Sequence, residues 1–298
     1  MSVNNNFRDN SQVTTFTQHN SSRSESNEER KKDKPKLDES TSSTGSYNPI
    51  PQYDIDKRGL VVTFNQENFL DGTKERVGTM QDVKALEKCF SDKRHFEFNC
   101  EKDLTKELVQ EEIASVATRK KYKDYSYVII IFLSHGDAGG RIKLSGDDDI
   151  TNEEIWQPFC SADSIWRNKP KLFIFQACKG SEFTFIDNLN IDIGKKHQMV
   201  PKEADILVGY STVEGNVSIR TPDGTWYIQN LCKIINEYGK REDILDILTR
   251  VNHEIAHNCE APGSCIRNVP NDKTIKQMPM FLSTLTKKFY FYSQANRI

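Results

Sequence analysis

The sequence predicts an α/β domain with a mainly parallel sheet, on the strength of two observations. Short apolar runs of strand length recur along the chain, and between them lie stretches whose apolar residues return at helical spacing. Alternation of buried strands with amphipathic helices is typical of such a sheet. In these folds ligands bind beyond the carboxyl ends of the strands, so polar residues that directly follow the runs are the first candidates for a site.

Six apolar or aromatic runs are expected to form the strands. In chain order they are 59–64, 95–100, which alternates only weakly, 127–133, 171–177, 206–211 and the late aromatic run 289–292. Apolar residues spaced i, i+3, i+4 and i+7 predict helices over 79–90, 104–116, 228–235 and 244–255, and a short one over 151–156. Thr79 is expected to cap the first helix.

Two segments lack the pattern of a packed core. Residues 1–50 are predicted to be disordered, because residues 21–40 carry 12 charged side chains, six of each sign, and Leu37 is their single large apolar residue. Residues 181–200 have no clear period, and we interpret them as a flexible linker. The folded part is expected to begin near Tyr53.

Charge and cysteine content exclude several classes of protein. A formal net charge of −2 over 298 residues argues against a dominant role in binding nucleic acid or membranes. No stretch approaches the ~18 apolar residues of a membrane span, and the polar residues 1–20 lack the apolar core of a secretory signal. Seven unpatterned cysteines without a CxxC pair predict free thiols in a reducing, cytoplasmic compartment.

A cysteine and a histidine follow two of the predicted buried strands. Cys178 lies on a tight turn directly after one run, and His135 follows the run 127–133. Because ligands bind at the carboxyl edge of such a sheet, both side chains are expected at a site there. A thiolate is the attacking form of cysteine, and a neighbouring imidazole can take and return its proton. The pair therefore predicts nucleophilic catalysis.

Several separated motifs resemble the caspase family, cysteine endopeptidases that cut after aspartate, and the resemblance covers about residues 53–298. Leu133-Ser-His-Gly136 is similar to the family's catalytic histidine segment, and Gln176-Ala-Cys178 to its known nucleophile signature. Arg76-Val-Gly-Thr79 and Ser218-Ile-Arg220 resemble the two arginine segments of its aspartate pocket. Chance could supply one of these motifs but not the ordered set.

The resemblance implies a fold and a division of the chain. The fold would be a central, mainly parallel six-stranded sheet flanked by helices, in one composite domain of two subunits. Residues 1–50 would be the prodomain, 51–187 the large catalytic subunit, 188–200 the intersubunit linker and 201–298 the small subunit. Two large–small pairs would form a symmetric homodimer after an upstream protease cuts the linker.

The resemblance also implies roles for individual residues, with no cofactor and no metal. Cys178 would be the nucleophile, His135 the general base and acid, and the backbone amides of Gly136 and Cys178 the donors to the oxyanion. Paired guanidiniums suit a desolvated carboxylate because they donate bidentate hydrogen bonds. The substrate aspartate is accordingly expected to be bound by Arg76, Gln176, Ser218 and Arg220.

The sequence departs from the family pattern beside the nucleophile and in the substrate subsites. Lys179 stands where the family most often has arginine, so we expect the loop around Cys178 to be held less firmly. Val217 and Ile219 stand where many executioner caspases carry aromatic residues of the second and fourth subsites. The preference upstream of the aspartate therefore stays open.

The resemblance favours a zymogen of the short-prodomain, executioner type that acts in apoptosis. Asp187 is the preferred cleavage site in the linker, because a polar residue follows it, whereas bulky Ile193 follows Asp192. The lack of helical periodicity in residues 1–50 disfavours a folded recruitment domain and an initiator role. The tail could be removed after Asp33, Asp38 or Asp54.

Two alternatives belong to other functional classes. A silent caspase-like regulator would dimerise with active relatives, although the retained His135, Cys178 and arginines argue against it. A zinc protease is suggested by the literal H-E-x-x-H of residues 253–257, with Glu254 as base and Glu260 as a third ligand. Such a five-residue motif has a high false-positive rate.

Overall fold

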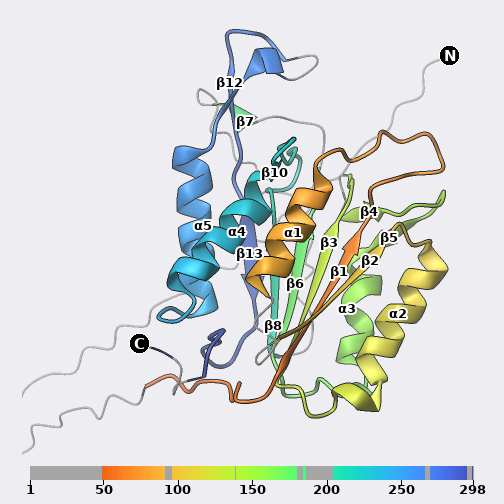
Figure 1. Ribbon diagram of the computed structural model, residues 1–298, viewed down its shortest axis with the longest axis vertical. Helices are drawn as coiled ribbons and strands as arrows, with labels where there is room; N and C mark the ends of the chain where they lie inside the picture. Colours follow the sequence, from red (N-terminus) through yellow and green to blue (C-terminus); the bar gives the residue numbers. More distant parts are fainter. Residues whose placement is uncertain are drawn as a thin grey trace, which may run out of the picture. The chain divides into compact units, whose positions relative to one another are not determined.

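A six-stranded sheet forms the centre of the computed structural model, which describes residues 49–90, 96–137, 139–179, 184–185, 204–265, 269–293 and 297 (Figure 1). The strand order is β13-β8-β6-β3-β1-β2, and only the β13–β8 pair is antiparallel. The strands are β1 (Gly59–Asn65), β2 (Phe96–Lys102), β3 (Tyr127–Leu133), β6 (Lys171–Gln176), β8 (Ile206–Tyr210) and β13 (Met280–Ser283). The predicted fold class is confirmed.

Helices cover both faces of the sheet (Figure 1). They are α1 (Thr79–Cys89), α2 (Lys106–Thr118), α3 (Asn152–Cys160), α4 (Trp226–Tyr238) and α5 (Ile244–Asn258), with 3₁₀ turns at Lys120–Tyr122 and Gly263–Cys265. The first helix begins differently from the prediction. Gly78, in a left-handed conformation, is its N-cap, and the Thr79 hydroxyl instead donates to Asn65 Oδ1 at 2.6 Å.

Alternate residues of each central strand pack into two different cores. Val61 and Ile129 face the core under α1, α4 and α5, whereas Leu60 and Val128 face the core under α2 and α3. Because both faces of β1, β3 and β6 are buried, apolar residues fill most of their positions, which is why the sequence reveals them as runs. The buried polar exceptions are Thr63, Asn65, Lys171 and Gln176.

The predicted strand at 289–292 is wrong, and β13 takes its place at the edge of the sheet. Phe289 and Phe291 are buried in the core, where Phe289 packs edge-on against Tyr127 at 5.0 Å and Phe291 lies 6.1 Å from Phe90. The Phe289 carbonyl accepts a hydrogen bond from the Ile244 amide at the start of α5. The alternating burial of these rings produces the sequence pattern of a strand, although the backbone of 289–292 pairs with no strand among the described residues.

Short strand pairs gather at the carboxyl ends of the parallel strands, at the top of Figure 1. They are β4 (Arg141–Lys143) with β5 (Asp149–Thr151), β9 (Arg220–Thr221) with β10 (Gly224–Thr225), and β12 (Thr274–Lys276) between β11 (Ala261–Pro262) and β7 (Thr184–Phe185). Two residues of the predicted linker thus form β7. Asp187, the rest of the predicted linker up to 200 and residues 1–48 of the predicted disordered tail lie outside the described residues.

The described residues were compared with the expectations about membrane spans and cysteines. None of their helices combines the length and the apolar character needed to cross a bilayer. Cys89, Cys100, Cys160, Cys178, Cys232 and Cys259 are free thiols. The second observation agrees with the prediction of unpaired cysteines.

Candidate active site

The sheet register brings His135 and Cys178 to the same edge. Leu133 of β3 is paired with Gln176 of the neighbouring strand β6, and the two candidate residues follow these partners at equal distance along the chain. The two strand ends are held level, because the Ser134 amide donates to the Gln176 carbonyl at 3.1 Å. The sequence prediction that these strands deliver both residues to one edge is therefore confirmed.

Gly136 allows the two loops to approach each other closely. A Cβ atom at this position would lie 2.5 Å from the Cys178 carbonyl oxygen and 3.0 Å from the Ala177 Cβ. Any side chain would therefore push the histidine loop away from the nucleophile loop. Within the described residues, the backbone amides of Gly136 and Cys178 have no hydrogen-bond partner. Two unengaged N–H donors beside a thiol are the arrangement that an oxyanion needs.

The imidazole of His135 is oriented by a backbone carbonyl. Its Nε2 lies 2.8 Å from the Lys74 carbonyl oxygen, and its ring packs against Phe69 at 5.2 Å between centroids. Because a carbonyl can only accept, Nε2 carries the hydrogen, and the neutral ring presents Nδ1 as its acceptor. The sequence did not predict either contact, because a backbone carbonyl leaves no signal in the residue type and Phe69 lies far from His135 in the chain.

The surroundings of His135 favour its neutral form. Burial lowers the pKa of His135 from 6.5 to about 4, and the positive charges of Arg76 and Arg220 act in the same direction. An imidazole that is neutral near pH 7 can accept a proton from a thiol. The structure therefore presents His135 in the form that a general base requires.

We expect the stability of the protein to reflect this shift. Between about pH 4 and 6.5 the unfolded chain binds a proton at His135 that the native state does not bind. The free energy of unfolding should therefore fall as the pH falls through this window, and more steeply than in His135→Gln. Chemical denaturation at a series of pH values measures both slopes. Equal slopes for the two proteins would contradict the lowered pKa.

Cys178 lies against the segment that carries Ser218. Its Sγ accepts a hydrogen bond from the Ser218 amide at 3.4 Å. The side chain of Gln176 reaches the same residue, because its Nε2 donates to Ser218 Oγ at 2.7 Å. Gln176 Oε1 is buried without a partner in the described residues. The structure thus joins Gln176, Cys178 and Ser218, three residues that the sequence assigns to one site.

Arg76 is a fully buried cation, and some of its hydrogen-bond donors are not used. Its Nη1 donates to the Gln66 carbonyl at 3.1 Å and to Thr79 Oγ1 at 2.7 Å, but Nε and Nη2 have no partner within the described ranges. Burial, and then the like charge of Arg220, lower the pKa of Arg76 to about 9, so the guanidinium is still charged at neutral pH. Buried donors without acceptors are costly, and an anionic ligand would relieve that cost.

Arg220 lies beside Arg76 and completes the positive end of the site. Its Nε donates to the Val77 carbonyl at 3.0 Å, which ties the segment of Arg220 to the segment of Arg76. Burial lowers the pKa of Arg220, and the charges of Cys178 and Asp82 raise it. The Cys178 side chain is therefore close enough for a thiolate there to act electrostatically on both guanidiniums. The sequence prediction that these residues form one site is supported by this proximity.

Lys179 is anchored more firmly than its residue type suggests. Its Nζ lies 3.0 Å from Glu214 Oε2 and 3.9 Å from the centre of the Tyr210 ring, and 13% of its side chain is exposed. Glu214 Oε1 also accepts a hydrogen bond from the Gly139 amide at 3.1 Å. Lys179 therefore makes both an ion pair and a cation–π contact, and the expectation that it holds the loop less firmly than an arginine would stays a prediction.

The two aliphatic residues expected in the subsites differ in exposure. Ile219 is buried in a small apolar cluster with Val269 and Ile275, whereas Val217 is partly buried and packs against that cluster. Of the two, only Val217 therefore offers a substantial part of its side chain to a ligand in this structure.

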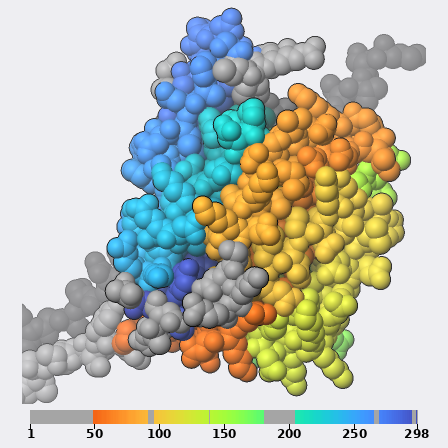
Figure 2. Space-filling view, viewed as in Figure 1, coloured from red at the N-terminus to blue at the C-terminus, as the bar shows by residue number. Residues whose placement is uncertain are grey.

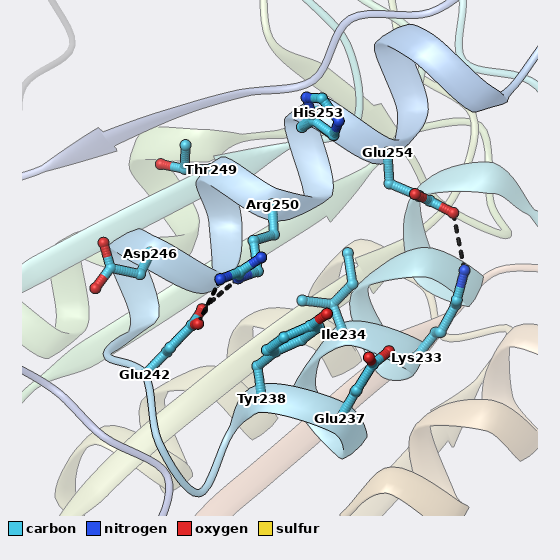
Figure 3. A pocket seen from close by; sticks show the side chains of 10 residues that line it. All are labelled: Lys233, Ile234, Glu237, Tyr238, Glu242, Asp246, Thr249, Arg250, His253 and Glu254. Atoms are coloured by element: carbon cyan, nitrogen blue, oxygen red, sulfur yellow. Dashed lines mark hydrogen bonds and ion pairs between the residues drawn. The ribbon is translucent and has the colours of Figure 1, made fainter.

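The H-E-x-x-H segment lies in α5, beside a groove between α4 and α5 (Figure 3). This groove has a volume of about 810 Å³ and shares no lining residue with the Cys178 site. The Glu254 carboxylate is engaged by Lys233 Nζ and Asn258 Nδ2, each at 2.8 Å, and Glu260 pairs with Lys276 at 3.2 Å. No group of three histidine, cysteine or carboxylate ligands suited to a metal occurs among the described residues.

Comparisons with known proteins identify the family of this chain. The family described as "Caspase domain" matches residues 58–290. Caspase-7 of Gallus gallus is 34% identical over 82% of this chain and 81% of its own length, and Caspase-3 of Mus musculus is 34% identical over 80% and 86%. The crystal structure of Caspase-1 from Spodoptera frugiperda superposes with a TM-score of 0.71 at 26% identity, covering 84% of this chain and 97% of the other. The chain belongs to the caspase family.

Proposed function

We propose that this protein is a cysteine endopeptidase that cuts proteins after aspartate. The observation that carries the proposal is the buried Arg76, whose Nε and Nη2 lack acceptors among the residues that the structure describes, while Arg220 and the Cys178 thiol lie close by. A carboxylate is the side chain that two guanidiniums bind best. A substrate aspartate held there would bring its own carbonyl carbon to the thiol.

The mechanism follows from the placement of the groups. His135 takes the proton of Cys178, and the resulting thiolate attacks the carbonyl carbon after which the chain is cut. The amides of Gly136 and Cys178 donate to the oxyanion that forms. The imidazolium then protonates the leaving amine, and water, activated by the neutral imidazole, releases the acyl group from sulfur. No metal or cofactor is required for any of these steps.

Cleavage of short peptides tests this proposal. The purified, linker-cleaved protein is incubated with three fluorogenic tetrapeptides that differ only in ending with Asp, Glu or Ala. We expect cleavage of the Asp peptide alone, insensitive to a chelator and stopped by a thiol alkylator. Inhibition by the chelator but not by the alkylator would favour the zinc alternative. No cleavage by a correctly processed protein would favour the silent regulator.

The division of the chain into subunits is part of the proposal. Residues 1–50 are the prodomain, 51–187 the large subunit and 201–298 the small subunit, with the linker 188–200 between them. Such a division is supported by the way the site is built, because Arg76 and Cys178 come from the first part and Arg220 from the second. An upstream protease would cut after Asp187 and so activate the zymogen.

Replacing Asp187 with alanine should keep the chain intact. Incubation of the purified variant with the activating protease is expected to leave one band on a denaturing gel, since the peptide bond after Asp187 is the one proposed to be cut. The matched variant Asp192→Ala should be processed like the wild type. Unchanged processing of Asp187→Ala would show that the linker is cut elsewhere.

A homodimer of large–small pairs is the proposed assembly. Strand β13 is the last strand of the sheet on its side, so its outer edge can pair with the same strand of a second copy about a two-fold axis. We place the protein in the cytoplasm, where the free thiols of the described residues stay reduced. Its proposed role is that of an executioner protease in apoptosis, acting on proteins that carry an accessible aspartate.

A further inference from the structure

We propose that Asp82, a buried residue of α1, is a positioning residue for substrate binding. Its carboxylate holds the β9–β10 hairpin against α1, and thereby places Arg220 beside Arg76. The inference rests on the proposed preference for aspartate and adds a residue that no motif in the sequence singles out.

The carboxylate of Asp82 connects two parts of the chain that are far apart in sequence. Its Oδ1 accepts hydrogen bonds from the Thr225 amide at 2.9 Å and from Gln229 Nε2 at 2.8 Å. The residue is 0% exposed, and its Oδ2 has no partner within the described residues. Burying this carboxylate costs free energy because it loses its hydration, and its two hydrogen bonds offset part of that cost while they fix the geometry of the hairpin.

The Thr225 amide belongs to the hairpin that carries Arg220. Thr225 of β10 is paired with Arg220 of β9, so a bond that holds one residue also fixes the other. Close approach is made possible by Gly224, which has a φ of 110° and where a Cβ would lie 2.5 Å from Asp82 Oδ1. The β9–β10 hairpin therefore packs directly against the Asp82 carboxylate.

Further contacts join the same two segments. A Cβ at Gly78, which has a φ of 88°, would lie 2.5 Å from the Thr221 carbonyl oxygen, and Arg220 Nε donates to the Val77 carbonyl. Figure 1 shows β10 next to the start of α1, and Figure 2 shows α1 and α4 meeting along a continuous seam. The two arginines are therefore brought together by docking of one segment on the other, and Asp82 supplies the buried carboxylate in that contact.

Asp82 also balances the charge of the pocket without blocking it. Burial raises the pKa of Asp82 itself, while the negative charge of its ionised form raises the pKa of both Arg76 and Arg220. Among the described residues, Asp82 Oδ2 and the Nε and Nη2 atoms of Arg76 all lack a hydrogen-bond partner, so Asp82 leaves these N–H groups of Arg76 to a ligand. A counter-charge behind the pocket would stabilise two adjacent guanidiniums while the pocket is empty.

Kinetics of the linker-cleaved protein test the proposal. We expect Asp82→Asn to raise KM for the Asp peptide roughly tenfold, the effect of weakening charge-assisted hydrogen bonds, with kcat changed less than about twofold. The rate at which iodoacetamide alkylates Cys178 should stay unchanged, since that small uncharged reagent does not use the arginines. Glu87→Gln, which removes an exposed carboxylate from the same helix, should behave like the wild type. An unchanged KM in Asp82→Asn, or kcat, alkylation and thermal stability falling together, would overturn the assignment.

A second measurement does not depend on catalysis. In the Cys178→Ala background, hydrogen exchange of the hairpin around Arg220–Thr225 should become faster when Asp82 is replaced by Asn, while the β4–β5 hairpin is unaffected. Equal exchange in the Arg220 hairpin would overturn the proposal. If the wild-type protein fails to cleave the Asp peptide, the proposed function fails, and the exchange experiment still decides whether Asp82 positions Arg220. Asp82→Asn keeps one oxygen acceptor, so it tests the idea even where Asp82→Ala does not fold.

Discussion

Replacement of Cys178 by alanine is expected to lower kcat for the Asp peptide by at least about 10⁴-fold, because the proposed acyl intermediate forms on its sulfur. The half-buried thiol makes only weak contacts, with the Ser218 amide and carbonyl. The free energy of unfolding should therefore change by less than about 1 kcal/mol. Loss of activity without loss of stability is what we expect for a nucleophile. Steady-state kinetics measure the activity, and chemical denaturation measures the free energy of unfolding.

The exposed Cys100 of β2 supplies the matched control. Cys100→Ala removes a thiol from the same sheet and should retain wild-type kinetics. Equal losses in the two variants would show that the substitutions act through the fold rather than through the reacting sulfur.

Replacement of Arg220 by alanine should reduce kcat/KM for the Asp peptide roughly 10²- to 10³-fold, mainly through KM. This reduction in kcat/KM is the size expected when one partner of a desolvated pair of opposite charges, here the guanidinium that binds the substrate carboxylate, is removed. Arg220 suits the test better than Arg76, because Arg76 is fully buried and also holds the Gln66 carbonyl and Thr79. Truncating Arg76 would combine loss of binding with loss of stability.

Two further variants separate charge from geometry. Arg220→Lys keeps the positive charge but loses the planar fork, so we expect only part of the loss to be recovered. Arg241→Ala removes an exposed arginine that follows α4 and contacts the Glu237 carbonyl, and should leave kcat/KM unchanged. An Arg220→Ala protein that cleaves the Asp peptide at the wild-type rate would remove Arg220 from the pocket.

Strands that are buried on both faces could be predicted from the sequence, whereas the partly exposed strand at the edge of the sheet could not. β3 and β6 are buried at every position, so apolar residues run through all of β3 and through β6 between Lys171 and Gln176. β13 is partly exposed along its length and follows Gln277-Met-Pro279, a segment without a strand pattern. The run 289–292 alternates in burial because its rings fill the core, and sequence periodicity does not distinguish that arrangement from a ladder.

Within the site, the reacting side chains were predictable and their supports were not. His135 and Cys178 follow buried strands, and parallel register places strand ends together. The Lys74 carbonyl that orients His135 is a backbone group, and any residue type could supply it. Glu214 and Asp82 act through contacts with segments distant in sequence, so their identity as acids carries no local signal. Tertiary contacts, rather than motifs, reveal these three.

Covalent trapping tests the central claim most directly, namely that Cys178 attacks the carbonyl of an aspartate held by Arg76 and Arg220. The linker-cleaved protein is treated with a peptide electrophile ending in Asp, and in parallel with the same electrophile ending in Ala, before peptide mapping by mass spectrometry. The account predicts rapid modification of Cys178 by the Asp reagent, at least about tenfold slower modification by the Ala reagent, and loss of this difference in Arg220→Ala. Modification at another residue, or equal rates with both reagents in the wild type, would contradict it.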